Sequence, residues 1–461
     1  MILKDSSYKK IQDIVGSKYC SRSKEDLICY SYDGTANRYL PDAVVFPEKT
    51  SEVSSILKLA SLDGFFVIPR GSGTGMTGGS VPVMGGVVIV MNRFNHVIEI
   101  DTDNFTATVE PGVITAQFHR EVEKFNLFYP PDPSSSEFST LGGNLAECAG
   151  GPRAVKYGVT RDYVLGLEAV LPTGEVIKTG VKTAKGVVGY DLTRLLIGSE
   201  GTLGIITQIT VKLLSLPESV KTMTASFPEL DKAAKTVSEI IRQGIVPRTI
   251  EFMDKESIKC VEKYLGTAIA ADSKALLIIE VDGRSDEAES SIKQLKELCI
   301  SLGAKDVRIA GSKEDAALIW KARKSISPAL FTYAPDKINE DIVVPRSKIP
   351  DMVQKINSMR NKTGLTIASF GHAGDGNIHF NIMLDKKNSE DLKKAETAIE
   401  ELFDYTIELG GTISGEHGVG ITKAAYMAKE IGPVEIELMK KIKNLFDPKG
   451  ILNPGKMFVE H

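Results

Sequence analysis

The sequence predicts an α+β protein with two main domains, and three observations support this expectation. The chain has 461 residues, enough for two or three domains with full hydrophobic cores. Its first part alternates short apolar runs with glycine-rich turns, which is the pattern of a domain rich in β-sheet. Beyond Leu216 and Pro217 the strands alternate with long amphipathic helices. This change predicts a second, α/β domain with helices over one face of its sheet.

The first domain is expected to span residues 1–217. Apolar runs bounded by turn residues predict strands over 43–46, 65–69, 86–91, 97–100, 106–109, 166–171, 176–179 and 204–213. Helical periodicity predicts helices over 51–61 and 115–125.

The second domain is expected to span residues 218–425. Its predicted strands are 222–227, 249–253, 275–281, 306–309, 341–344, 366–370 and 377–383. Its predicted helices are 229–243, 286–302, 347–362 and 390–409. The remaining segment, 426–461, carries a short predicted helix over 434–445 and is expected to pack back on the first domain.

Composition and charge argue against several classes of partner. The net charge of −4 gives no reason to expect a nucleic acid or an anionic membrane. No apolar run approaches about 18 residues, so no transmembrane segment is expected. The first residues, MILKDSSYKK, lack the apolar core of a leader peptide, which favours a cytoplasmic location. The five cysteines form no C-x-x-C pair, so no sequence-local zinc or iron–sulfur site is expected.

A glycine loop, PRGSGTGMTGG, follows the second predicted strand. Its Gly73-x-Gly75-x-x-Gly78 spacing matches the nicotinamide dinucleotide fingerprint, but Ser80, Val81 and Pro82 follow where that fingerprint requires a helix. No Gly-Lys-Ser/Thr is present, so a Walker A loop is excluded as well. The loop therefore predicts a strand–loop–strand unit that wraps an anion with backbone N–H groups and Arg70. A plain mobile turn is the alternative.

Two further segments, 129–159 and 189–207, are similarly rich in glycine and small residues. More than half of the 41 glycines lie between Gly64 and Gly204. Such density favours backbone that closely approaches a large flat ligand, although an ordered loop alone is the simpler alternative.

A second cluster of chemistry-bearing residues surrounds three histidines. His372 and His379 are seven residues apart and would face opposite sides of one strand, but the intervening Ala-Gly-Asp-Gly predicts a turn that lets them converge. GEHGVG adds Glu416 and His417. Two histidines and a carboxylate suit Zn²⁺, Fe²⁺ or Mn²⁺, whereas packed or hydrogen-bonded histidines are the alternative. Upstream, Trp320 and Arg323 share one face of an expected helix, and a guanidinium is well suited to bind a carboxylate.

The motifs PRGSGTG, PPDPSS, GGN, GGPRAVKYG, GSEGTLGI, GHAGDGNIH and GEHGVG occur in that order. In this combination the chain resembles the flavin-binding family of vanillyl-alcohol oxidase and murein-precursor reductase relatives. It is most similar to the branch of glycolate oxidase large subunits, D-lactate dehydrogenases and D-2-hydroxyglutarate dehydrogenases. The resemblance implies an FAD-binding domain of the p-cresol methylhydroxylase (PCMH) type. It also implies an α/β cap domain with an antiparallel sheet, the substrate domain of FAD-linked oxidases.

The resemblance further implies which residues bind FAD. The expected cofactor residues are Arg70, Gly71, Ser72, Gly73, Thr74, Gly75, Gly78, Pro131, Asp132, Ser134, Thr140, Gly143, Asn144, Gly150, Gly158, Glu200, Gly201, Gly204, Ile205, Ile206 and Asn453. Some relatives bind flavin covalently through a histidine in the first glycine loop. Thr74 stands there in this chain, so non-covalent FAD is expected.

By the same resemblance, His372, His379 and Glu416 are expected to bind a divalent metal, and His417 is expected to act as the catalytic base. The expected substrate residues are Arg323, Ser327, Lys337 and Asn381, with Asn339 as a further candidate. Asp375 is interpreted as a turn residue or as a partner of a metal ligand.

The expected activity is oxidation of a D-2-hydroxy acid, D-lactate or glycolate, to the 2-oxo acid by metal-assisted hydride transfer to flavin N5. A metal-independent flavin alcohol oxidase is one alternative, and a non-catalytic flavin subunit of an electron-transfer complex is another. The expected electron acceptor is a separate partner: an electron-transferring flavoprotein, an iron–sulfur subunit, or a quinone or cytochrome. An electron-transferring flavoprotein would permit electron bifurcation.

Overall fold

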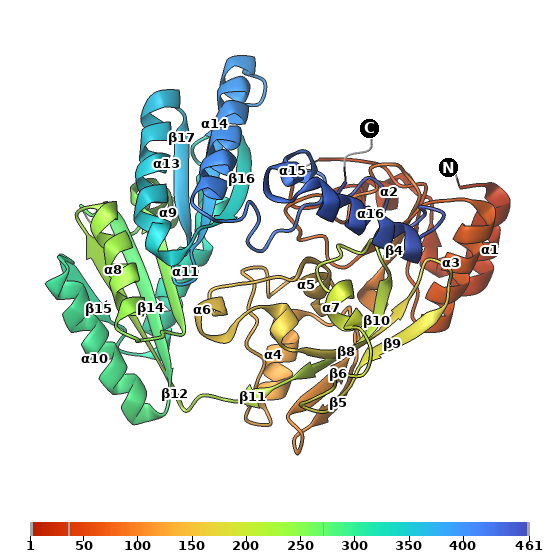
Figure 1. Cartoon of the computed structure of the whole chain (residues 1–461), viewed down its shortest axis with the longest axis horizontal. Coiled ribbons are helices and arrows are strands. Elements are labelled where there is room, and N and C mark those ends of the chain that lie inside the picture. The colour runs from red at the N-terminus through yellow and green to blue at the C-terminus, as the bar shows by residue number, and fades with distance from the viewer. Residues whose placement is uncertain (1–2, 36, 271, 459–461) are drawn as a thin grey trace. The chain divides into compact units, whose positions relative to one another are not determined.

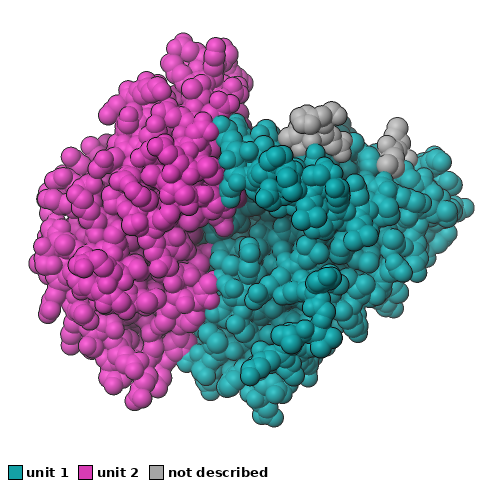
Figure 2. Space-filling model, in the orientation of Figure 1, with its two compact units in different colours: residues 1–150, 159–216, 416–461 teal, residues 151–158, 217–415 magenta. Residues whose placement is uncertain are grey.

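The computed structural model describes residues 3–35, 37–270 and 272–458, and it divides into two compact units (Figures 1 and 2). Unit 1 comprises residues 1–150, 159–216 and 416–461, and unit 2 comprises residues 151–158 and 217–415. The sequence placed 151–158 in the first domain and 416–425 in the second, so the division of the chain differs at both segments. The physical reason for the first difference is that Lys156 and Tyr157 bond to Asp282, far along the chain.

Unit 1 contains a small sheet with the strand order β1-β2-β4-β3. Its strands are β1 (Cys20–Ser21), β2 (Ala43–Val45), β3 (Val67–Arg70) and β4 (Val87–Val90). Strands β2, β4 and β3 pair in parallel. The connection from β3 to β4 is the glycine loop and contains no helix, as the sequence predicted.

A five-stranded antiparallel sheet with the order β5-β6-β10-β8-β9 completes the sheet structure of unit 1, with a short β7–β11 pair. Its strands are β5 (Val97–Asp101), β6 (Thr106–Val109), β8 (Val164–Val170), β9 (Val176–Gly180) and β10 (Ile205–Lys212), and the pair is β7 (Leu127–Phe128) with β11 (Leu214–Ser215).

The described α-helices of unit 1 include five that the sequence did not predict. Those five are α1 (Asp5–Val15), α2 (Lys24–Cys29), α5 (Leu141–Glu147), α7 (Leu192–Leu196) and α15 (Met427–Glu430). The others are α3 (Thr50–Asp63), α4 (Thr115–Glu123) and α16 (Pro433–Phe446). Helices α5 and α7 lie inside the two glycine-rich segments, because Leu141, Leu145 and Leu196 give each short helix a buried apolar side.

Unit 2 is built on a seven-stranded antiparallel sheet with the order β15-β12-β14-β13-β17-β18-β16. Its strands are β12 (Ser219–Phe227), β13 (Thr249–Asp254), β14 (Ala275–Gly283), β15 (Asp306–Ile309), β16 (Asp336–Val343), β17 (Thr366–His372) and β18 (Asn377–Leu384). Helices α8 (Leu230–Arg242), α10 (Ser285–Ser301), α13 (Ile349–Thr363) and α14 (Ser389–Glu408) form the predicted helical layer.

A second group of helices lies on the face of this sheet that carries Met253, Ile278 and Phe370. This group is α9 (Lys255–Leu265), α11 (Lys313–Lys324) and α12 (Ile326–Leu330), whose apolar side chains share one core cluster with those strand residues. Helix α11 was expected from Trp320 and Arg323. Helix α9 was missed, and the short α6 (Ala154–Tyr157) completes the unit.

Within the described residues, none of the helices is long and apolar enough to cross a membrane.

Candidate active site

The glycine loop between β3 and β4 is shaped largely by its own contacts. A Cβ at Gly73 would lie 2.1 Å from Arg70 Nη2, and Gly73 has a φ of +71°. A Cβ at Gly71 would lie 2.3 Å from Thr140 Oγ1. Arg70 is buried, donates from Nη1 to Ser80 Oγ at 3.3 Å, and has a pKa lowered by its burial. The Arg70 guanidinium therefore packs against the glycine loop itself. Arg70 was predicted to bind an anion together with the backbone of this loop.

Gly75 differs from these glycines because its backbone borders open space. Among the described residues, the only atom within 4 Å of a Cβ built at Gly75 is Glu147 Oε1, at 3.9 Å, and Gly75 has no left-handed φ. The Gly75 carbonyl accepts from Gly34 N at 2.9 Å, so the open space lies on the Cα side. By contrast, a Cβ at Gly78 would lie 2.5 Å from Ile421 Cγ1. Packing explains Gly78, whereas neither packing among the described residues nor a left-handed backbone explains Gly75.

Several predicted cofactor residues are joined to one another by hydrogen bonds in unit 1. Thr140 caps α5 by accepting from Gly143 N at 3.3 Å, and Asn144 Nδ2 donates to Thr115 Oγ1 at 2.8 Å. The Asn453 side-chain amide donates to Gly79 O at 2.9 Å and to Glu200 O at 2.7 Å. Asn453 thus links the C-terminal segment to two of the three predicted FAD segments, the glycine loop and 189–207.

Glu200 is oriented toward the C-terminal segment. Its two carboxylate oxygens accept from Val419 N and Gly420 N, each at 2.7 Å. Burial raises the pKa of Glu200, although these N–H groups and the charges of Lys456 and Lys423 oppose that shift. Glu200 therefore contacts the backbone that follows His417.

The other predicted cofactor residues fall into separate groups. Pro131 O lies 2.9 Å from His119 Nε2, and Ser134 is exposed. The side chain of Ile205 belongs to a hydrophobic core, so this residue has only its backbone to offer a ligand. Gly158, with a φ of +81°, lies in unit 2, unlike the rest. The remaining members, in loops or turns of unit 1 or at the start of β10, are Ser72, Thr74, Asp132, Gly150, Gly201, Gly204 and Ile206.

Glu416 and His417 lie in unit 1, at its junction with residue 415. Thr77 Oγ1 donates to His417 O at 3.0 Å, so the backbone of His417 is fixed to the glycine loop. A Cβ at Gly150 would lie 2.9 Å from Glu416 Oε2, so the glycine leaves room for that carboxylate. Glu416 directly follows Gly415, whose N donates to Asp341 Oδ2 at 2.9 Å in unit 2.

His372 and His379 converge at the turn between β17 and β18, as predicted. Their Nε2 atoms are 3.5 Å apart, and both side chains are buried. The chain reverses tightly because Gly376, with a φ of +91°, leaves no space for a Cβ beside Val344 O. Asp375 Oδ1 accepts from Asn377 N at 3.2 Å, which is the turn role predicted for it.

The spacing of the two histidines fits a metal site. Two nitrogens bound at about 2.0–2.1 Å to a tetrahedral ion lie about 3.3–3.4 Å apart. The observed distance of 3.5 Å is close to this value, and imidazole nitrogens are preferred ligands of Zn²⁺ and Fe²⁺. The residues present therefore fit a divalent metal.

Glu251 on β13 is a buried carboxylate that the sequence analysis missed. His372 Nδ1 lies 2.6 Å from Glu251 Oε1, and Arg323 Nε donates to Glu251 Oε2 at 2.7 Å. Burial by itself would raise the pKa of Glu251, but the charges of His372 and Arg323 and their hydrogen bonds lower it overall. Arg323, predicted to bind the substrate carboxylate, is thus also tied to the partner of a predicted metal ligand.

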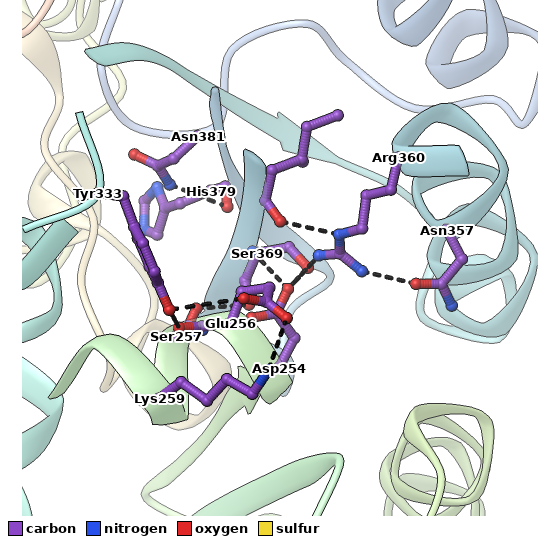
Figure 3. Close-up of polar contacts among 11 residues, drawn as sticks. Asp254, Glu256, Ser257, Lys259, Tyr333, Asn357, Arg360, Ser369, His379 and Asn381 are labelled. Carbon is purple, nitrogen blue, oxygen red and sulfur yellow. Dashed lines mark hydrogen bonds and ion pairs between the residues drawn. The ribbon is translucent and has the colours of Figure 1, made fainter. Parts of the chain in front are cut away.

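The remaining predicted substrate residues lie along the same face of the sheet. Strand β16 begins at Asp336, five residues before its predicted start at 341, so Lys337 and Asn339 are strand residues. Asn339 pairs opposite Asn381, with Asn339 Nδ2 donating to Asn381 Oδ1 at 3.1 Å. Lys337 Nζ donates to Ser327 Oγ at 2.7 Å, and burial lowers the pKa of Lys337 to about 8. Figure 3 shows Asn381 donating to the His379 carbonyl.

Solved structures place this fold among the PCMH-type flavoproteins. A p-cresol methylhydroxylase structure with substrate bound aligns over 100% of this chain and 98% of its own, with a TM-score of 0.80 and 17% identity. A 4-ethylphenol oxidase from Gulosibacter chungangensis covers 98% of this chain and 97% of its own, with a TM-score of 0.78 and 18% identity. At such identities the likeness shows the fold alone, and it confirms the predicted α+β fold class.

Sequence relatives then define the family. Residues 41–180 match the family described as FAD binding domain, and residues 216–457 match the C-terminal domain of FAD linked oxidases. Glycolate oxidase subunit GlcD of Bacillus subtilis is 46% identical over 100% of this chain and 98% of its own. A D-lactate dehydrogenase of Archaeoglobus fulgidus is 37% identical over 93% of this chain and 95% of its own. The chain belongs to the FAD-linked oxidases and is an FAD-linked oxidoreductase.

Proposed function

We propose that this protein is an FAD-dependent dehydrogenase that oxidises a D-2-hydroxy acid, D-lactate or glycolate, to the 2-oxo acid. The observation that carries the proposal is the facing pair of His372 and His379 Nε2 atoms, with Arg323 and Lys337 on the same face of the sheet. Facing imidazoles suit a cation, and the two basic groups suit the carboxylate of the substrate. The names of the relatives, glycolate oxidase subunit and D-lactate dehydrogenase, support the substrate class.

FAD would be held non-covalently by unit 1, and Thr74 is the residue that replaces the histidine of covalent relatives. When bound, FAD supplies the acceptor for the hydride that leaves the substrate α-carbon. The open backbone at Gly75 and the N-terminal turn of α5, around Thr140 and Gly143, are the parts of the unit that favour such a ligand.

A divalent metal, Zn²⁺, Fe²⁺ or Mn²⁺, would be held by His372, His379 and Glu416. When bound, this metal supplies Lewis-acid polarisation of the substrate hydroxyl. Glu416 is included because chain connectivity places it one residue after Gly415, which is bonded to Asp341 opposite His379 on β18.

The chain's own residues then bind the substrate and move its proton. Arg323 and Lys337 bind the carboxylate and so orient the α-carbon, while Asn381, Asn339 and Ser327 contribute polar contacts. His417 accepts the hydroxyl proton as general base. Its backbone bond to Thr77 holds this base against the glycine loop.

The reduced flavin would pass its electrons to a separate acceptor, so we propose that this protein works with a partner. We also propose that the protein is cytoplasmic. The term subunit in the names of the GlcD relatives supports a partner chain. The candidate acceptors are an electron-transferring flavoprotein, an iron–sulfur subunit, and a quinone or cytochrome.

An anaerobic titration of the purified yellow protein tests this proposal. We expect D-lactate or glycolate to bleach the flavin absorbance near stoichiometry, whereas L-lactate leaves it oxidised. The carboxylate contacts of Arg323 and Lys337 and the hydroxyl contact of His417 together would turn the α-hydrogen of one enantiomer toward the flavin. Dithionite provides the control for complete reduction. Absence of bleaching by D-lactate, glycolate and D-2-hydroxyglutarate alike would refute the proposed substrate class.

A further inference from the structure

Glu251 occupies a central position between two groups with different predicted tasks. It lies on β13 directly opposite His372 on β17, and its side chain has no exposed area. Its Oε1 atom is 2.6 Å from His372 Nδ1. Its Oε2 atom is 2.7 Å from Arg323 Nε and 2.6 Å from Arg323 Nη2. One carboxylate therefore contacts the histidine through one oxygen and the guanidinium through the other.

This arrangement is costly as a purely structural device. Burying a carboxylate and a guanidinium removes both from water, and a well-packed apolar pair is commonly as stable as a buried ion pair. Arg323 is itself only 5% exposed. Because Oε1 contacts His372 and Oε2 contacts Arg323, the single carboxylate of Glu251 orients both side chains at once.

The contact with Oε1 determines which nitrogen of His372 remains available. A carboxylate accepts hydrogen bonds only, so in the neutral imidazole, the form that can bind a metal, the His372 proton is on Nδ1 and the lone pair is on Nε2. That Nε2 atom is the one that faces His379 Nε2. An imidazole fixed in this way is a stronger and better oriented metal ligand.

The contacts with Oε2 fix the guanidinium plane of Arg323. Its Nε–H donates to Glu251 Oε2, and its Nη2 atom lies 2.6 Å from the same oxygen as an ion pair. Among the described residues Nη2 is buried without a hydrogen-bond partner, so its N–H groups are the donors that this guanidinium can offer to another anion. The Phe370 ring, whose centroid is 4.8 Å from Arg323 Cζ, supports the same orientation.

We propose that Glu251 is a positioning residue that couples metal binding at His372 to substrate-carboxylate binding at Arg323. This inference rests on the proposed function, since it assigns Glu251 to the same site. Glu251 touches neither metal nor substrate. Its removal should nevertheless weaken the binding of both.

The test compares Glu251→Gln with a matched control, Glu280→Gln, in the FAD-loaded protein stripped of metal with a chelator. Glu280 is also a buried carboxylate on this face, but its partners are Thr222, Trp320 and Arg248. Mn²⁺ binding is measured from the electron paramagnetic resonance signal of the free ion. Binding of oxalate, a dicarboxylate product mimic, is measured from the change in flavin absorbance.

We expect Glu251→Gln to weaken Mn²⁺ binding by about 10- to 100-fold and to weaken oxalate binding as well. Glu280→Gln should leave both affinities within about threefold of the wild type. Arg323→Lys should weaken oxalate binding while leaving Mn²⁺ binding near the wild-type value, which separates the two arms of the coupling.

Equal Mn²⁺ affinity in wild-type protein and Glu251→Gln would overturn this inference while leaving the proposed function intact. Failure of the wild-type protein to bind Mn²⁺, Zn²⁺ or Fe²⁺ would instead defeat the metal centre of the proposed function. If Glu251→Gln does not fold, Glu251→Asp replaces it, because the shorter carboxylate keeps the charge but withdraws from His372. An unchanged Mn²⁺ affinity in Glu251→Asp would equally overturn the inference.

Discussion

Individual glycines of the glycine loop have different structural reasons, and the sequence alone did not show which glycines the packing of the fold requires. Gly73 and Gly78 have positive φ values and would place a Cβ against Arg70 and Ile421, so the fold itself requires glycine there. Gly75 meets neither condition, and under the proposed function a ligand approaches its backbone. The count of glycines predicted a cofactor segment, but only the contacts of each glycine distinguish packing from binding.

Lys337 gives a pH dependence at the residue scale. Burial lowers the pKa of its ammonium from 10.5 to about 8, so its positive charge is present below that pH and is lost as the pH rises through it. Under the proposed function a charged Lys337 binds the substrate carboxylate, so KM for the hydroxy acid should rise above pH 8 by up to about tenfold per pH unit. Steady-state kinetics between pH 6.5 and about 9.5 measure this effect.

Lys337→Gln supplies the control for that prediction. The variant should show a higher KM at pH 7 and lose the rise at alkaline pH. If the variant keeps the same alkaline rise in KM as the wild type, another group is responsible and Lys337 does not bind the carboxylate.

Glu251 shows what residue-level reading of the sequence missed. In Thr249–Phe252 polar and apolar residues alternate, which is typical of a strand with one solvent-exposed face. The structure buries Glu251 on the polar face as well, because Arg323 and His372 provide ion-pair and hydrogen-bond partners for it. Partners 72 and 121 residues away along the chain leave no local signal. The turn between His372 and His379, by contrast, was predictable because its Ala-Gly-Asp-Gly sequence is local.

At the scale of elements, the sequence predicted strands best where they are apolar. Strand β16 was predicted to begin at 341 because its first half, Asp336–Glu340, is mostly polar. Those polar residues include Lys337 and Asn339, two predicted substrate residues, so the first half of the strand lacks the apolar pattern by which strands were predicted. Helix α9 was missed although Ile258 and Val261 give it a buried side.

Asp254 joins three elements of unit 2 and gives a stability prediction. It caps α9 by accepting from Ser257 N at 2.8 Å, and it accepts from Ser369 N at 2.7 Å on β17. It also pairs with Arg360 of α13, as Figure 3 shows. Asp254→Ala should lower the free energy of unfolding of unit 2 by about 3–5 kcal/mol, because Arg360 is left without its partner carboxylate. Denaturation followed by the fluorescence of the single tryptophan, Trp320, reports on this unit.

Asn388→Ala is the matched control, because Asn388 caps α14 by accepting from Glu390 N and Asp391 N without any ion pair. A lost cap alone should cost about 1 kcal/mol. Equal losses in the two variants would show that the ion pair of Asp254 adds nothing to the stability of unit 2.

At the scale of the whole molecule, the chain order does not follow the division into units. Residues 151–158 belong to unit 2 although they carry all but the first residue of the GGPRAVKYG motif of the FAD segment, and Asp282 binds Lys156 and Tyr157 there. The change in pattern near Pro217 was visible in the sequence. The assignment of residues 151–158 to unit 2 was not visible, since their partners, which include Asp282 and Gly374, lie far along the chain.

The most direct test of the account is the reduction of the flavin by D-lactate in metal-free protein. Stopped-flow absorbance would follow the anaerobic reaction of native, chelator-stripped and Zn²⁺-, Fe²⁺- or Mn²⁺-reloaded protein, with FAD content checked in each sample. We predict that stripping slows flavin reduction at least about 100-fold and that one of the metals restores it. Reduction at the native rate by protein stripped of metal would contradict the account, because His372, His379 and Glu416 would then have no part in the oxidation.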